Sequence, residues 1–493
     1  MKRAAVLLLL ALPGCTVGPD YQEPVLSPPA SFQESAANGE APFGVPATSE
    51  ADLSQWWRAF NDPELDSLVA RAFAANLDLQ AAASRILVAR EQEIVQGAAG
   101  LPTVNATGAA VRLHSNSNPL GIFGGGGAAM QGAPASSSGA DIKLYSAGFD
   151  ATWEADIFGG VRRSVEAARA GSDAAMWELR DAQVSLSAEV ANDYLNLRAT
   201  QERIAIIQSE LQRQRDTLGI IQARFATGFV TGLDVDQQTA QVEATAAQLP
   251  PLQAQEHVLA HAIAVLIGVQ PEAMSSELQT PGTLTASAAT LPIGLPSDLL
   301  RRRPDVREAE RKLAAATAQI GVAVADLYPK FNLIAVLSFA GNSFTRLLSS
   351  DNFGQGGIAM ITWPIFNGGK TRATIRIDEE QENQAYLAYQ QSVLRALQDT
   401  EDALSRYTTE QQRLVSLQQS IAAANSSFII AQDQYITGLA TYQNVLTAET
   451  ALLNAEDAAA QSRAALATDI VALYKALGGG WATSAALDEP SAQ

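Results

Sequence analysis

Apolar residues recur every three or four positions through two long, proline-free stretches of the chain. In the second half this stripe consists of Tyr386, Tyr389, Val393, Leu397, Leu404, Tyr407, Leu414, Leu417, Ile421, Ala424 and Phe428. A mean spacing of about 3.5 residues is typical of a helix that packs lengthwise on its neighbours. The pattern therefore predicts helices at 161–227 and 370–437, each about 100 Å long at roughly 1.5 Å per residue.

Four shorter segments alternate between apolar and polar residues, which predicts β-strands with two unlike faces. In the clearest segment Tyr145, Ala147, Phe149, Ala151 and Trp153 share one face, and Asp150, Thr152, Glu154 and Asp156 share the other. One face suits lipid and the other suits water, as in a transmembrane barrel with a polar lumen. We predict strands at about 102–113, 143–157, 331–341 and 355–366.

Two short motifs recur at nearly the same distance, which indicates an internal duplication. Phe158-Gly159-Gly160 matches Phe366-Asn367-Gly368-Gly369 at an offset of 208 residues, and Thr227-Gly228 matches Thr437-Gly438 at an offset of 210. Each repeat then reads as a helix, two strands, a long helix, a tight turn and a return helix. The predicted order is a signal peptide at 1–14, a lipid-anchored extended strap at 15–55, a first repeat at 56–268, a linker at 269–293, a second repeat at 294–477 and a polar tail at 478–493.

The chain begins with the pattern of an exported protein. Lys2 and Arg3 precede an apolar run that is too short for a bilayer of roughly 30 Å, as in a signal peptide. The run leads into Leu12-Pro13-Gly14-Cys15, and Cys15 is the only cysteine, so no internal disulfide can form. This segment resembles a bacterial lipobox, with Cys15 as the lipidation site. The alternative is an ordinary cleaved signal with an incidental cysteine.

Charge and motifs argue against nucleic-acid binding and against catalysis. A formal charge of -19 does not suit a phosphate-binding surface. His257 and His261 lie one helical turn apart, but no third metal ligand is evident. The tetraglycine Gly124–Gly127 lacks the lysine of a phosphate-binding loop and is interpreted as a surface loop. Arg301–Arg303 could form an anion site or a charged turn. We expect no enzyme activity, no cofactor and no metal.

The predicted strands require several copies of the chain. No run of 18 apolar residues is found, so we expect the sheet, and no helix, to cross the membrane. Four strands cannot close a barrel, and open strand edges are costly in lipid. Three copies would give twelve strands and room for a lumen. The expected fold is a mixed α+β membrane protein, a trimeric 12-stranded transmembrane β-barrel continued by a long α-helical barrel.

Three segments resemble the outer-membrane efflux proteins, the TolC-like channels, and among them the OprM-like lipoprotein branch. They are Val17–Tyr21, Gly294–Leu333 and Trp363–Gly369. The resemblance implies a homotrimer in the outer membrane with a periplasmic helical extension. It also implies a periplasmic adaptor and an inner-membrane pump of the RND class as partners. The implied function is an exit duct for drugs or other small molecules; the alternative is the outlet of a type I protein secretion system.

The resemblance also directs attention to the two turns at the ends of the long helices. Adaptor contact is expected there, at Gly228, Thr231, Gly232, Gly438, Leu439 and Thr441. Asn444 and Thr447 match positions where the family often carries aperture carboxylates, and Gln443 and Glu449 lie close by in the sequence. Asp234 and Asp236 of the first repeat could instead supply an anionic ring that attracts cations. The alternative is that these two aspartates cap a helix.

Overall fold

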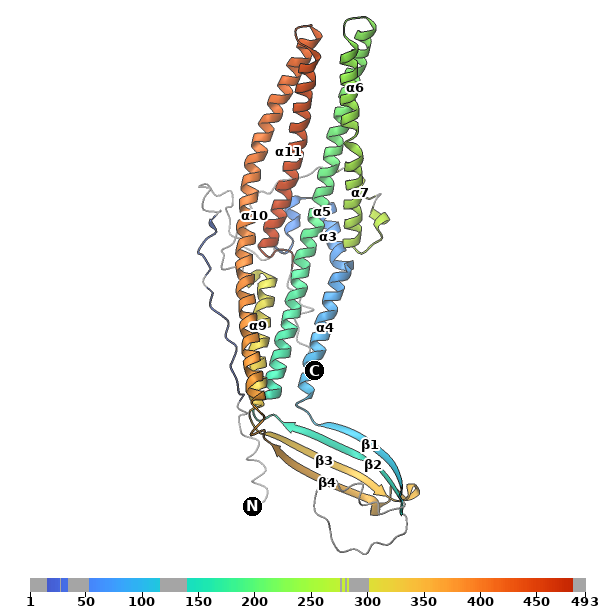
Figure 1. Ribbon diagram of the computed structural model, residues 1–493, viewed down its shortest axis with the longest axis vertical. Helices are drawn as coiled ribbons and strands as arrows, with labels where there is room; N and C mark the ends of the chain where they lie inside the picture. Colours follow the sequence, from blue (N-terminus) through green and yellow to red (C-terminus); the bar gives the residue numbers. More distant parts are fainter. Residues whose placement is uncertain are drawn as a thin grey trace. The chain divides into compact units, whose positions relative to one another are not determined.

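The computed structural model describes residues 16–26, 28–33, 53–115, 140–274, 277–279, 282 and 301–481 (Figure 1). The expected signal peptide with Cys15, the tetraglycine segment Gly124–Gly127 and most of the expected linker and tail lie outside these residues. The chain divides into two compact units that do not follow the two sequence repeats. The sheet unit takes its described residues from Met1–Gln22, Val88–Ser172 and Lys312–Ala385, and the helical unit from Glu23–Leu87, Asp173–Arg311 and Tyr386–Gln493.

The sheet unit contains one antiparallel sheet in the order β1-β2-β3-β4. Its strands are β1 (Thr103–Ser115), β2 (Ala140–Ala155), β3 (Lys330–Gly341) and β4 (Phe353–Thr362). Two short 3₁₀ turns, η5 (Phe344–Arg346) and η6 (Ser350–Asn352), join β3 to β4. Among the described residues, β1 and β4 each have one edge without a partner strand, so the sheet is open on both sides.

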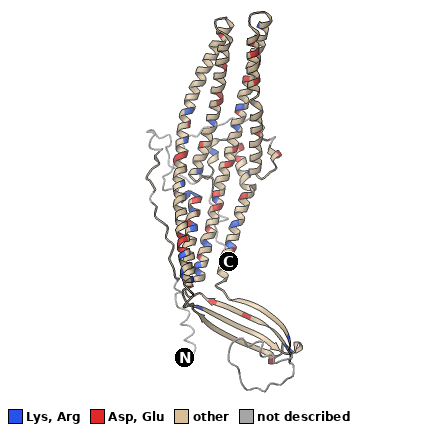
Figure 2. Ribbon diagram, in the orientation of Figure 1, with Lys and Arg blue, Asp and Glu red and all other residues tan. Residues whose placement is uncertain are grey.

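The strand register places the expected apolar residues on one face. Trp153 lies opposite Leu333, which lies opposite Ala359, and directly opposed residues of antiparallel strands share a face. The other face carries Asp150, which accepts a hydrogen bond from Asn105 Nδ2 at 3.1 Å. Figure 2 shows few charges on the strands and many on the helices. The alternation is weaker in β3 and β4, where Val336, Ile334, Ile358 and Met360 share the face of Asp150.

Strand β4 ends at Thr362, earlier than the expected 366. Pro364 has no backbone N–H for a ladder hydrogen bond, which accounts for the early end. The indole Nε1 of Trp363 donates instead to the carbonyl of Leu327 at 2.9 Å.

The long helices are α5 (Gly160–Ala226) and α10 (Lys370–Ile436), where the sequence predicts 161–227 and 370–437. Helix α4 (Leu77–Ala98) precedes β1, and α9 (Pro304–Ala325) precedes β3. The first return is split into α6 (Gly232–Ala246) and α7 (Leu249–Leu266), since α7 accommodates its prolines in the first turn, where no helical N–H bond is lost. The second return is the single helix α11 (Tyr442–Ala476).

Within the helical unit, α5 packs antiparallel against α11. Arg203 Nε donates to Asp457 Oδ1 at 2.6 Å, and Ile221 packs on Tyr442 and Val445. Low-numbered residues of α5 thus contact high-numbered residues of α11. Helix α10 is joined to α11 by a hydrogen bond of 2.5 Å from Ser462 to Glu410. The packing therefore joins two helical hairpins, α5–α6 and α10–α11, along the line where α5 meets α11.

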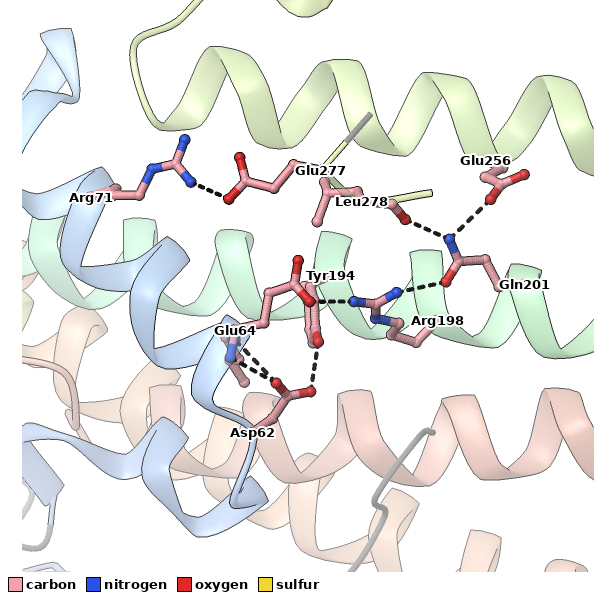
Figure 3. A network of polar contacts seen from close by, with 10 residues as sticks. Asp62, Glu64, Arg71, Tyr194, Arg198, Gln201, Glu256, Glu277 and Leu278 are labelled. Atoms are coloured by element: carbon pink, nitrogen blue, oxygen red, sulfur yellow. Dashed lines mark hydrogen bonds and ion pairs between the residues drawn. The ribbon is translucent and has the colours of Figure 1, made fainter. Parts of the chain in front are cut away.

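A polar network fixes the shorter helices on α5 (Figure 3). The chain turns through the 3₁₀ helix η2 (Trp56–Phe60) and enters α3 (Pro63–Ala75), which Asp62 caps by accepting from the backbone N–H of Glu64 at 2.9 Å. Tyr194 donates to Asp62 at 2.6 Å, and Arg198 pairs with Glu64 at 2.6 Å. Gln201 donates to Glu256 of α7 at 2.9 Å, so α3, α5 and α7 share one network.

The expectation that no helix could cross a membrane is too strict. Helix α10 contains an 18-residue window with a mean hydropathy of 1.2 and at most two charged residues, none of it buried within the protomer. By length and composition this window could span a bilayer. Polar residues interrupt it, which is why a search for uninterrupted apolar runs does not find it.

Candidate functional site at the helix tips

The two hairpins end in turns of the same geometry. Gly228 and Gly438 both have φ +77°, a conformation that favours glycine. The backbone N–H of Phe229 donates to Arg224 O at 2.9 Å, and that of Leu439 donates to Gln434 O at 2.8 Å. These bonds, each to the carbonyl five residues earlier in the chain, define the Schellman motif. Because both repeats close their long helix in the same way, the two tips are structural counterparts.

The residues expected to contact an adaptor are accessible in the protomer. All six are exposed, namely Gly228, Thr231, Gly232, Gly438, Leu439 and Thr441. Two large apolar side chains stand out from the turns, Phe229 at 78% exposure and Leu439 at 82%. Exposed apolar side chains at a polar tip are typical of a contact surface. The adaptor role of these residues stays a prediction.

The two aspartates of the first tip lie in different surroundings. Asp234 accepts from the backbone N–H of Thr231 at 3.0 Å and from its hydroxyl at 3.1 Å, which closes a capping box at the start of α6. Asp236 is exposed. Asp234 therefore caps the helix, as the alternative interpretation has it, whereas Asp236 is not part of the capping box. Whether either lines an aperture stays a prediction.

In the second tip, Gln443, Asn444 and Thr447 are exposed and lie on one side of α11. Glu449 does not join them, because its side chain is only 2% exposed. Two positions along a helix differ by roughly 200° around its axis. The side chain of Glu449 therefore points away from the face of Thr447. Glu449 is thus separate from the exposed face of Gln443, Asn444 and Thr447, and its place at an aperture stays a prediction.

A buried polar chain, which the sequence interpretation missed, lies between the hairpins beneath the tips. The hydroxyl of Tyr442 donates to Gln238, whose Nε2 donates to the carbonyl of Gln214 at 2.8 Å. Gln214 Nε2 in turn donates to Glu210 at 2.8 Å. The chain links α11, α6 and α5. Glutamines at positions of an apolar helix stripe are the sequence signal that could have indicated this chain.

Aromatic contacts close the same region. The rings of Tyr435 and Tyr442 lie 5.1 Å apart, and the Arg224 guanidinium lies 5.1 Å from the Tyr435 ring centroid. Burial raises the pKa of Tyr435, and the Asp234 charge adds to this effect. Tyr435 therefore stays neutral, and its contact with Arg224 is of the cation–π type.

The other candidate chemistry remains structural in character. The rings of His257 and His261 lie 6.5 Å apart, and no group of three or more metal-ligating side chains occurs in the described parts of the chain. Arg303 pairs with Asp305 at 2.7 Å and with Asp399 at 3.0 Å, and it also donates to the carbonyl of Ala476. These contacts fit the charged turn better than the anion site.

Comparison with known proteins identifies the family. The family model for outer membrane efflux protein matches residues 68–269 and 295–479. Nodulation protein T of Rhizobium leguminosarum bv. trifolii is 33% identical over 399 residues, which are 80% of this chain and 79% of that protein. The pyoverdine export outer membrane protein OpmQ of Pseudomonas aeruginosa is 33% identical over 478 residues, 96% of this chain and 95% of that protein.

The fold is also that of solved channels. The structure of the outer-membrane channel OprN is matched with a TM-score of 0.86 and 36% identity, over 95% of this chain and all of that one. Such channels are trimers with a helical barrel and a sheet, and this chain has four strands in its sheet. The expected fold class is thereby confirmed. The chain belongs to the outer membrane efflux protein family, whose members are channels of the outer membrane and not enzymes.

Proposed function

We propose that three copies of this chain form the exit duct of a tripartite efflux system for small organic molecules. The observation that carries the proposal is the order of elements in each repeat, where a strand of the sheet leads into a long helix. Helix α5 is the next element after β2, and α10 is the next after β4. Both long helices end in the same exposed turn. A wall that changes from sheet to helix continues a membrane pore into a tube.

The exposed tips are the proposed docking surface for a periplasmic adaptor. Two apolar side chains on glycine turns, Phe229 and Leu439, recur in equivalent places in each protomer, so a trimer would present six such turns. Repeated contacts of this kind allow weak single interactions to add up to firm attachment. The adaptor would connect the duct to an inner-membrane pump of the RND class, as the resemblance implies.

The strap that follows Cys15 supports a lipid anchor beside the sheet. Arg163 Nε donates to Val17 O at 3.1 Å, and its guanidinium pairs with Asp20 at 2.6 Å. Thr16 packs so closely on Gly159 that a Cβ there would lie 2.5 Å from its methyl group. Thr16, the residue that follows Cys15 in the sequence, thus lies against Gly159 in the link between β2 and α5.

The proposed class of cargo is inferred from the name of a similar protein. OpmQ is named for the export of pyoverdine. A small organic molecule is thus the proposed cargo, and the secretion of a polypeptide is the competing outcome of the test.

The test compares ethidium accumulation in cells with and without this chain. Deletion should raise accumulation several-fold, and the wild-type chain should restore it. The double variant Phe229→Asp with Leu439→Asp should fail to restore it. Leu348→Asp is the matched control, since Leu348 is 75% exposed but lies in the β3–β4 link. Equal accumulation in both strains, or loss of a secreted polypeptide alone, would contradict the proposal.

A further inference from the structure

Glu449 of α11 is a buried carboxylate without a donor. Its side chain is 2% exposed, and among the described residues no N–H or O–H donor is bonded to either carboxylate oxygen. An ionised carboxylate in such a place is strongly disfavoured, because it has lost its hydration and gained no hydrogen bond in exchange. The geometry therefore favours a protonated side chain.

The neighbour of Glu449 is a second buried carboxylate, Glu210 of α5, which is 0% exposed. Glu210 accepts from Gln214 Nε2 at 2.8 Å and from Arg213 Nε at 2.8 Å, so its negative charge is compensated. Arg213 is further paired with Glu456 of α11 at 3.4 Å. The hydrogen-bond donors are thus concentrated on Glu210, and Glu449 is the member of the pair that is left without a donor.

The groups around Glu449 offer no further compensation. Helix α5 contributes Glu210 and Arg213, and α11 itself contributes Tyr442 and Glu456. Helix α6 contributes the uncharged Gln238 and, nearer the tip, Asp234, which acts on Tyr442. The contacts Glu410–Ser462 and Tyr435–Tyr442 place residues 423–428 of α10 beside Glu449, and this stretch has no titratable side chain.

The pair occupies the line where the two hairpins meet. Glu210 belongs to the α5–α6 hairpin and Glu449 to the α10–α11 hairpin, and both lie in the helical unit. One proton between them converts a repulsive contact into a hydrogen bond from one carboxyl to the other. The same contact without the proton sets two negative charges against each other inside the packing.

We propose that Glu210 and Glu449 form a proton-binding site that holds the two hairpins together beneath the tips. When the proton leaves, water must reach Glu449, and α11 loosens from α5 to admit it. That this loosening affects the opening of a channel rests on the proposed function; the proton site itself does not.

The pH dependence follows from the direction of the shift. Burial first, and the Glu210 charge second, raise the pKa of Glu449 from 4.5 to about 8, while Arg213 opposes them. A carboxyl whose folded-state pKa is raised stabilises the packed state in full below its ordinary pKa. The contribution is lost as the pH rises through about 8. The packed interface is therefore expected at neutral pH and a loosened one in alkali.

Infrared titration of the purified protein tests the proton site. Wild-type protein at pH 6 should show the C=O stretch of a protonated carboxyl that disappears as the pH passes about 8. The variant Glu449→Gln should lack this band, and Glu243→Gln, an exposed carboxyl of α6, should keep it. Glu210→Gln should move the titration to lower pH. A wild type without the band, or a band unchanged in Glu449→Gln, would overturn the site.

Amide hydrogen exchange on the same samples tests whether the proton site holds the two hairpins together. After correction for the intrinsic pH dependence, exchange in 445–453 should rise about tenfold between pH 7 and pH 9, in step with the deprotonated fraction. Glu449→Gln should remove this rise, and Glu243→Gln should not. If the rise persists in Glu449→Gln, or if the wild type shows no rise, the proton site does not hold the hairpins together. Neither measurement involves transport, so either can fail while the efflux role stands.

Discussion

At the scale of single residues, two glycines and one arginine hold the N-terminal strap, namely Gly18, Gly321 and Arg163. A Cβ on Gly18 would lie 2.5 Å from Gly321 Cα, and a Cβ on Gly321 would lie 2.7 Å from Arg163 Cγ. The Arg163 side chain is 4% exposed and binds two carbonyls of the strap. The strap is thus fixed by backbone contacts that tolerate no extra atom.

We expect Gly321→Ala to release the strap. The added methyl group would displace Arg163, and overpacking of this kind costs roughly 1–3 kcal/mol. Chymotrypsin should then cleave after Tyr21 several times faster than in the wild type. Gly171→Ala is the control, because no atom lies within 4 Å of a Cβ there and alanine favours the helix. Equal cleavage rates in the two variants would mean that this close contact does not fix the strap.

Residue roles were the least predictable part of the sequence. Val17–Tyr21 drew attention only as a family resemblance, and nothing in the sequence pairs it with Arg163, which is 143 positions from Asp20. Glu449 was assigned by its distance from Thr447 along the chain rather than by its angle around the helix. Glu210 gave no signal, since a glutamate on a long helix is normally solvated.

At the scale of elements, the tips show what the duplication predicts. The offsets of 208 and 210 residues place Gly228 and Gly438 in the same turn, and the structure gives both the same φ and the same hydrogen bonds. The repeats differ beyond the turn. Asp234 closes a capping box on α6, whereas Asn444 is the residue at the matching position of α11.

This difference leaves Asp236 as the acidic group that can face ions. We expect Asp236→Asn to lower the preference for cations in single-channel recordings, because an exposed carboxylate at a pore mouth attracts cations. The capping box of Asp234 stays intact in this variant. Glu243→Gln, two turns further along α6, should leave the preference as it is. An unchanged permeability ratio in Asp236→Asn would remove this residue from the mouth.

The strands were predictable where their faces differ and less so elsewhere. Strand β2 alternates between Phe149 or Trp153 on one face and Asp150 or Glu154 on the other, and this pattern fixes its register. Strand β4 was expected to continue to Phe366, because Trp363 and Ile365 keep the alternation. Pro364 ends the ladder in spite of that pattern.

At the scale of the whole molecule, the fold depends on contacts that one chain does not possess. The sheet leaves an open edge on β1 and another on β4, and the matching family consists of trimers. The sequence predicts such an assembly because unpaired strand edges are untenable in lipid. The apolar window of α10 is not evident from continuous apolar runs, because polar residues interrupt it.

The stoichiometry of the protein extracted from outer membranes shows whether three chains share one barrel. Native mass spectrometry in detergent should give a complex of three chains, since three sets of four strands close a barrel of twelve with room for a lumen. A monomer or a dimer as the only species would contradict a shared duct, because four strands leave their edges open and eight close a barrel whose interior is filled by side chains.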